Sequence, residues 1–457
     1  MKVNLIDIFS DNYKKLFLIG DERSLKARKN IAGSFFIKVI TVLSTFVTYP
    51  LIVNYLNPTR YGIFLTVSSI INWMFLLDIG FGSGLKNKLT EALAHGKIDL
   101  ARRYVSSTYA ILSLILFGIV LLFFFVNPII PWDKLLNVSD GYSKELESLI
   151  WIVFFSFCLS FILRLITNVI SAYQNPALVS FIDMIAQLLS LGCLCILILT
   201  TKSSLIHAGV IICFTPVVVY TIATIFLFRT KYKRVRPSFR LVDFALTRSL
   251  IGLGVKFFVA TISALVLFQT TNVFISNLVG PEDVTLFNVA YKLFGLGYTV
   301  IMIIATPYWA AFSDANAKND YVWMKITFDK LKNVFYVSLL IEVLLFMSSK
   351  WIFHLWMGQT VNIPLSVSLA VFIYCNITSW VTICIWPING IGKVKLQFYS
   401  SIIELIVIIP ITYLLGHFYG TPGIILAPIL VSLPRAIWAP IQLHKLINGT
   451  ASGVWAK

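Results

Sequence analysis

The stretch from Ile31 to Lys88 contains two long apolar runs that constrain the fold more than any other part of the chain. Each run is roughly 22 to 26 residues long, which is enough for a helix to cross a hydrocarbon core of about 30 Å. A short polar turn from Asn57 to Arg60 separates the runs. Because lipid offers no water to the backbone N–H and C=O groups, a spanning segment of this length is helical. The stretch therefore predicts a transmembrane hairpin.

Further runs of this kind follow along the chain, and its composition agrees with them. Hydrophobic residues make up 58% of the sequence and charged residues only 12%, against roughly 25% charged in a soluble domain. The sequence thus predicts an all-α, polytopic membrane protein with about 12 transmembrane helices. The predicted spans are 31–53, 61–84, 104–126, 149–172, 178–200, 205–228, 249–279, 285–311, 331–349, 364–389, 397–416 and 421–443.

The distribution of basic residues predicts the orientation of these spans. Of the 37 lysines and arginines, 27 fall in the terminal segments and in alternate loops, and only 5 fall in the opposite set of loops. Because cytoplasmic loops carry the excess of Lys and Arg, we expect both termini in the cytoplasm. The net charge of +17 is then a topology signal and does not indicate nucleic acid. The 6 cysteines show no metal-ligand spacing, so we expect no metal and no cofactor.

An internal repeat divides the chain. Residues 34–64 align with residues 256–287 if one residue is inserted, which pairs Pro58 with Pro281 and Phe64 with Phe287. Each half then holds six spans, related by a pseudo-two-fold axis along the membrane normal, and a substrate site is expected between the halves. The predicted organisation is a cytoplasmic segment 1–30, a first six-helix lobe 31–228, a basic linker 229–248, a second six-helix lobe 249–443 and a tail 444–457.

Three lysines within the predicted spans form the candidate substrate site. Lys38, Lys256 and Lys292 each belong to a stripe of polar residues at helical spacing in the repeated hairpins. A charge that faced lipid would cost roughly 2.5 to 3.5 kcal/mol, so such stripes line water or another polar helix. We therefore predict a cationic cavity between the halves, in which an anionic head group would bind. The alternative is that Lys38 and Lys256 extend to the membrane surface.

Six further ionisable residues lie within spans. Arg164 and Asp183, and likewise Arg435 and Glu404, sit at similar depth on neighbouring spans, which predicts two buried structural ion pairs. Glu342 shows no obvious partner in the sequence and is a candidate proton carrier. Asp78 opens the segment DIGFGSG at the cytoplasmic end of the second span and is a candidate for coupling or gating. No set of residues indicates a catalytic site.

The first hairpin carries motifs of a known family. Asn57-Pro58, Tyr61-Gly62, the run Asp78 to Gly82, Asn87 and the run Ala94 to Lys97 resemble the bacterial polysaccharide flippases (Wzx-like, O-antigen type) of the multidrug/oligosaccharidyl-lipid/polysaccharide exporter superfamily. The resemblance implies alternating access between two six-helix lobes. It also implies that an undecaprenyl-diphosphate-linked oligosaccharide moves from the cytoplasmic to the periplasmic leaflet. Besides membrane lipids, a polysaccharide polymerase and a chain-length regulator are candidate partners. The second half has no counterpart of Asp78.

Two alternatives remain open at this point. A multidrug exporter of the same superfamily would bind cations, yet the first span carries Lys38 and no acid. A membrane glycosyltransferase or polymerase would need a large external loop or a cluster of carboxylates. The longest external loop, about 127–148, contains no histidine and no evident acid pair. The sequence therefore favours a transporter over an enzyme.

Overall fold

The computed structural model describes residues 22–74, 81–173, 175–246, 266 and 269–456. Within these ranges the chain is almost entirely helical and forms no strand, which confirms the all-α prediction. Asp78 and Lys256 lie outside the described residues. The main helices are α2 (Glu22–Leu56), α3 (Pro58–Asn72), α4 (Phe81–Ala94), α5 (Ile98–Val126), α7 (Ser143–Leu163), α8 (Leu165–Ala172), α9 (Pro176–Thr200), α10 (Leu205–Arg229), α12 (Pro281–Ala317), α13 (Tyr321–Met357), α14 (Leu365–Ile391) and α15 (Lys395–Ile447).

Nine helical segments of the described residues are long and apolar enough to cross a membrane. They cover the predicted spans except the second and the seventh. The second is divided between α3 and α4, and most of the seventh lies outside the described residues. The predicted eleventh and twelfth spans both fall in α15.

α15 contains two membrane crossings. Its 53 residues would extend about 80 Å as one straight helix, far more than a bilayer needs. The backbone leaves helical geometry at Gly420, with φ 59° and ψ −142°. A Cβ atom on Gly423 would lie 2.1 Å from the carbonyl oxygen of Leu415. The chain therefore reverses at Gly420, and the two crossings meet tightly just beyond the turn.

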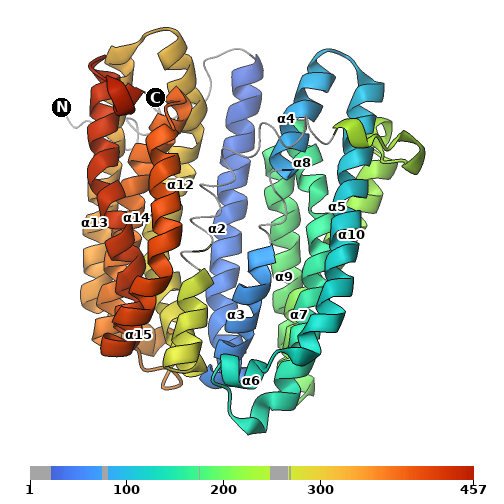
Figure 1. The fold of residues 1–457 in the computed structure, drawn as a ribbon, viewed down its shortest axis with the longest axis vertical. Coiled ribbons are helices and arrows are strands. Elements are labelled where there is room, and N and C mark those ends of the chain that lie inside the picture. Colours follow the sequence, from blue (N-terminus) through green and yellow to red (C-terminus); the bar gives the residue numbers. More distant parts are fainter. Residues whose placement is uncertain (1–21, 75–80, 174, 247–265, 267–268, 457) are drawn as a thin grey trace, which may run out of the picture.

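The helices stand side by side as two groups in Figure 1, with α13, α14 and α15 on one side and α5, α7, α9 and α10 on the other. We call α2–α10 the first half and the segment from residue 269 to α15 the second half. α2 packs along α9, and α7 packs along α10. α12 packs along α14 and also against α3, so α3 and α12 join the halves.

The basic linker between the halves lies against the first half. Two short turns, Lys233–Val235 and Phe239–Leu241, pack on α5. Ser106 Oγ accepts a hydrogen bond from the Ser238 N–H at 3.0 Å, and Ser107 Oγ accepts one from the Asp243 N–H at 2.9 Å. These bonds hold the described part of the linker on one helix of the first half.

The outward faces of the helices are apolar. On α5, Leu114, Phe117, Leu121 and Phe124 are all exposed, and they recur at helical spacing. A soluble protein rarely exposes such a continuous apolar surface. The same face is stable in contact with lipid tails, so the surface agrees with a protein that is embedded in a bilayer.

Candidate functional site at the junction of the two halves

Side-chain hydrogen bonds join the two halves at the end of the bundle that holds the turn between α2 and α3. Trp356 Nε1 donates to the carbonyl oxygen of Phe46 at 2.7 Å, which ties α13 to α2. Thr360 Oγ1 lies 2.5 Å from Asn54 Oδ1 just beyond the end of α13. Both contacts involve the last third of α2, next to the hairpin turn.

A second set of contacts joins α3 to the second half. Thr285 Oγ1 donates to the carbonyl oxygen of Pro58 at 2.6 Å. A Cβ atom on Gly62 would lie 1.5 Å from the carbonyl oxygen of Pro281, so α3 and α12 meet backbone to backbone there. Pro58 and Pro281, which the repeat pairs, each begin a helix at this point. Because Gly62 has no side chain, α3 and α12, the helices that begin at the paired prolines, can touch there.

Buried amides complete this junction. Asn272 Nδ2 donates to Ser69 Oγ at 2.8 Å, and Asn288 Nδ2 donates to Asn272 Oδ1 at 2.8 Å. All three residues are buried, where an unpaired polar group would cost about 1 to 3 kcal/mol. The network is specific, because it forms only when the two halves are in this register. The halves are therefore closed against each other at this end of the bundle.

Lys292 lies next to these contacts between the halves. Its Nζ atom is 5.4 Å from the centre of the Tyr49 ring on α2, and the Tyr49 ring packs edge-on against Tyr61 at 5.8 Å. Attraction between an ammonium and an aromatic face is worth about 0.5 to 2 kcal/mol, more when water is excluded. The cation therefore lies between α12 and α2, in contact with an aromatic ring, and the cavity stays a prediction.

Lys38 lies on the same face of α2 as Tyr49. The two residues are 11 positions apart, which corresponds to about 16 Å along the helix and only about 20° around it. Lys38 is exposed. The exposed apolar residues Leu43 and Val47, at 61% and 51%, lie about 140° and 180° around the helix from it. Lys38 thus belongs to the polar face of α2 and is separate from the face that suits lipid.

Glu342 is the most buried carboxylate of the described residues, with 1% of its surface exposed. The expectation that it lacks a partner was wrong. Asn376 Nδ2 on α14 donates to its Oε2 atom at 2.6 Å. Among the described residues its Oε1 atom has no hydrogen-bond partner, and it packs against Gly297 of α12, where a Cβ atom would lie 1.6 Å away. The carboxylate therefore stands where α12, α13 and α14 meet.

The two expected ion pairs differ in the structure. Arg435 Nη2 contacts Glu404 Oε2 at 2.5 Å and also donates to Ser401 Oγ, so this pair is direct. Between Arg164 and Asp183 no direct pair forms among the described residues. Instead, the Tyr220 hydroxyl donates to Asp183 at 2.5 Å, and the Arg164 guanidinium lies 5.2 Å from the Tyr220 ring centre. A tyrosine on α10 thus bridges the two charges.

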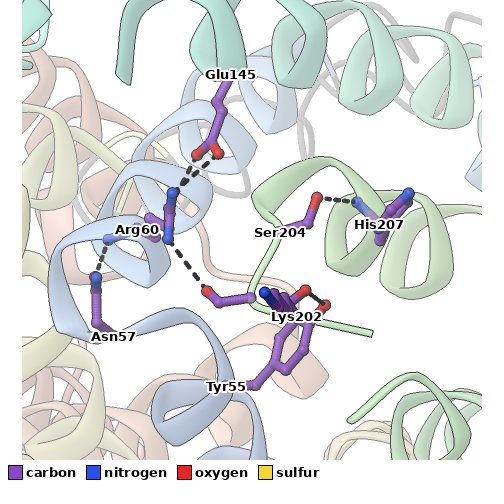
Figure 2. Close-up of polar contacts among 8 residues, drawn as sticks. Tyr55, Asn57, Arg60, Glu145, Lys202, Ser204 and His207 are labelled. Atoms are coloured by element: carbon purple, nitrogen blue, oxygen red, sulfur yellow. Dashed lines mark hydrogen bonds and ion pairs between the residues drawn. The ribbon is translucent and has the colours of Figure 1, made fainter. Parts of the chain in front are cut away.

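The sequence did not reveal the cluster around Arg60, which Figure 2 shows. Arg60 donates from Nε and Nη2 to both oxygens of Glu145 at 2.9 and 3.0 Å, and from Nη1 to Ser203 Oγ. Its own N–H donates to Asn57 Oδ1. Nearby, the Tyr55 hydroxyl donates to the carbonyl oxygen of Lys202 at 2.7 Å. The only signal was that Arg60 is the single cation in its loop, which did not indicate a partner 85 positions away.

Comparisons with known proteins agree with this architecture. The pattern of the family described as "Polysaccharide biosynthesis protein" matches residues 27–313. A "Putative O-antigen transporter" of Salmonella typhimurium is 22% identical over 435 residues, which cover 92% of this chain and 96% of that protein. A "Putative O-antigen export protein" of Yersinia pseudotuberculosis is 19% identical over 420 residues, which cover 90% of this chain and 94% of the relative.

Two solved structures share the fold. An inward-facing multidrug resistance MATE family transporter of the MOP superfamily superimposes with a TM-score of 0.73 at 14% identity, covering 92% of this chain and 100% of that one. A lipid II flippase in an inward closed conformation superimposes with a TM-score of 0.70 at 14% identity, covering 92% and 90%. At such low identity the likeness concerns the fold alone.

Proposed function

Because this chain belongs to the polysaccharide biosynthesis protein family, we propose that it is a flippase for lipid-linked oligosaccharides. The cargo is an undecaprenyl-diphosphate-linked oligosaccharide, such as a repeat unit of O-antigen or of another surface polysaccharide. Its direction is from the cytoplasmic to the periplasmic leaflet of the bacterial inner membrane. The observation that carries the proposal is the placement of Lys292 between the halves, above a junction closed on the outer side.

Each part of the cargo has a place in this arrangement. The diphosphate is anionic and fits a passage that presents Lys38 near its cytoplasmic end and Lys292 at its floor. A phosphate accepts charge-assisted hydrogen bonds from such ammonium groups. The sugars occupy the polar space between the halves, and the polyprenyl tail remains in lipid. Lys256, the third predicted lysine, would add to the same charge.

Alternating access follows from the few contacts that close the outer side. We propose that two lobes, 31–228 and 249–443, rock against each other, with residues 229–248 as linker and 1–30 and 444–457 as cytoplasmic ends. The contacts at Asn54 and Gly62 would break in the outward-open state. A ligand shifts such an equilibrium only through different affinities for the two states. The two lysines bind the cargo more tightly in the state in which both of them reach its diphosphate.

The orientation rests on where the basic segments gather. Lys97, the linker around Arg236, and Lys393 join helices at the end of the bundle opposite to Arg60, Lys134 and Lys202. The positive-inside rule places the first set, and both termini, in the cytoplasm. A polysaccharide polymerase and a chain-length regulator, which act on the flipped product, are the partners that this role would require.

Reconstituted vesicles test the proposed function directly. We expect proteoliposomes that contain the protein and an undecaprenyl-diphosphate-linked oligosaccharide to expose buried cargo to an added, membrane-impermeant periodate within minutes, while protein-free vesicles do not. A cation exporter of the same superfamily is the competing function, and ethidium efflux from the same vesicles measures it. Efflux of ethidium without movement of the lipid-linked sugar would refute the flippase and support the exporter.

Glu342 is the candidate for proton coupling in this cycle. Its charged form is poorly compensated, because one oxygen has a single amide donor and the other has none among the described residues. Because Glu342 stands where three helices of the second half meet, uptake or loss of a proton would alter how they pack. For Asp78 we propose the role in coupling or gating that the sequence suggests.

Substitution of Glu342 by Gln should remove the response to a proton gradient and leave the fold intact. The amide oxygen can still accept from Asn376, but the side chain can no longer titrate. For one coupled proton, a gradient of one pH unit can accelerate wild-type flipping by up to about tenfold, and the variant should show no acceleration. Glu282→Gln, an exposed acid at the start of α12, is the matched control. Unchanged acceleration in Glu342→Gln would exclude the coupling role.

A further inference from the structure

A groove on the second half lies apart from the junction. It is formed by α13, α14 and α15 and has a volume of about 360 Å³. Its surface is almost entirely apolar and includes Phe328, Trp380 and Ile441, and Lys332, His444 and Lys445 also line it. α13 contacts α2 of the first half through Trp356, at the end of α13 opposite to the groove. The groove therefore does not belong to the passage between the halves.

The depth of these residues separates them into two levels. α13 and the second crossing of α15 both reach the outer side, at Met357 and Gly420. Lys332 and Lys445 are each 25 residues from those points, or about 37 Å along the helix. Trp380 is 15 residues from Leu365, the outer end of α14, or about 22 Å. With a hydrocarbon core of about 30 Å, the lysines lie at the level of the cytoplasmic head groups and the indole lies within the acyl region.

The two lysines are held in place and keep donors free. Lys332 Nζ forms an ion pair with Asp329 at 2.7 Å and lies 5.2 Å from the centre of the Phe328 ring. Lys445 Nζ lies 4.6 Å from the centre of the Trp455 ring. An ammonium has three N–H donors, and Asp329 is the acid that faces this cluster on α13. Each lysine can therefore donate to a further anion.

We propose that this groove binds an anionic phospholipid of the cytoplasmic leaflet, with its phosphate between Lys332 and Lys445 and an acyl chain along Ile441 and Trp380. The charges match a phosphate at the depth where lipid phosphates lie, and the walls below match a hydrocarbon chain. The position of the groove, away from Lys38 and Lys292, indicates a resident lipid that stabilises the second half and is not transported.

Lipid titration of the purified full-length protein, followed by native mass spectrometry, tests the site. We expect phosphatidylglycerol to bind at least tenfold more tightly than phosphatidylcholine. The variant Lys332→Gln/Lys445→Gln should bind phosphatidylglycerol about tenfold or more weakly, given the gain that each basic group contributes near anionic lipid. The matched control Lys325→Gln/Lys330→Gln removes the same charge from exposed positions of the same helix and should bind as the wild type does.

Three results would overturn the proposal. Equal affinity for the two phospholipids would show that the lysines do not recognise the phosphate head group. Equal losses in the groove variant and in the control variant would show a general charge effect. If undecaprenyl phosphate binds more tightly than phosphatidylglycerol and loses its affinity in the groove variant, the occupant is the polyprenyl carrier and not a resident phospholipid.

Discussion

Cross-linking of positions 54 and 360 abolishes flipping, and reduction of the cross-link restores it: this is the expected result if the outer junction must open. Asn54 and Thr360 contact each other at 2.5 Å across the two halves. A short bifunctional methanethiosulfonate would join cysteines at these positions in a protein whose 6 native cysteines are replaced. The lock holds the halves in the state described here, so each molecule would complete no cycle. The flipping rate should fall to that of protein-free vesicles.

Matched cross-links identify the cause of this loss. Tyr55 and Thr201 contact each other at 2.9 Å within the first half, and cysteines cross-linked at those positions should leave the rate near its starting value. The single variants Asn54→Cys and Thr360→Cys, treated with the same reagent, should also remain active. If the locked protein still flips its cargo, the outer contacts do not open during transport and the alternating-access proposal is wrong.

Removal of the charges of Lys38 and Lys292 should slow flipping about a hundredfold. Each ammonium that donates to the diphosphate contributes about 1.5 to 3 kcal/mol, and loss of the two lower values together gives a factor of about 100. The double variant Lys38→Gln/Lys292→Gln is measured as the initial rate at cargo concentrations below saturation. The conservative variant Lys38→Arg/Lys292→Arg keeps both charges and should recover most of the rate.

The control for this effect uses basic residues on the outer surface. Lys202→Gln/Lys350→Gln removes the same net charge from two exposed positions, one between α9 and α10 and one near the end of α13, and should flip at the wild-type rate. If Lys38→Gln/Lys292→Gln also retains the wild-type rate, the passage does not recognise the cargo by charge. Addition of Lys256→Gln should deepen the loss, which would indicate whether the third lysine belongs to the same site.

Hydropathy predicted most of the fold because the bilayer requires each span to satisfy its own backbone. The turn at Gly420 lies between the predicted spans 397–416 and 421–443, and Pro58 and Pro281, which the repeat pairs, each begin a helix. The contacts of the site could not be predicted in this way. Whether Glu342 meets Asn376, 34 positions away, depends on how two helices are rotated against each other, and the length of an apolar run carries no information about rotation.

The side chains between Arg164 and Asp183 illustrate the same limit. The sequence placed both residues at similar depth on neighbouring spans, but the side chain that reaches both charges is Tyr220 on a third helix. Similarly, Tyr49 became part of the site only because α12 brings Lys292 over its ring. Sequence identifies which residues are costly in a membrane, and packing decides which neighbours offset that cost.

The Arg60–Glu145 pair has a mechanical consequence. It fastens the hairpin turn to α7, so α2 and α3 cannot splay apart at their outer ends and α2 must turn together with its neighbours. α2 is 35 residues long, about 52 Å. If the first half pivots near the outer contacts, a tilt of about 10° moves the far end of α2 by about 9 Å, by the geometry of a helix of that length. In such a motion the hairpin would act as a lever, so that a change of a few ångströms near the contacts between the halves becomes a larger displacement at the opposite end of α2.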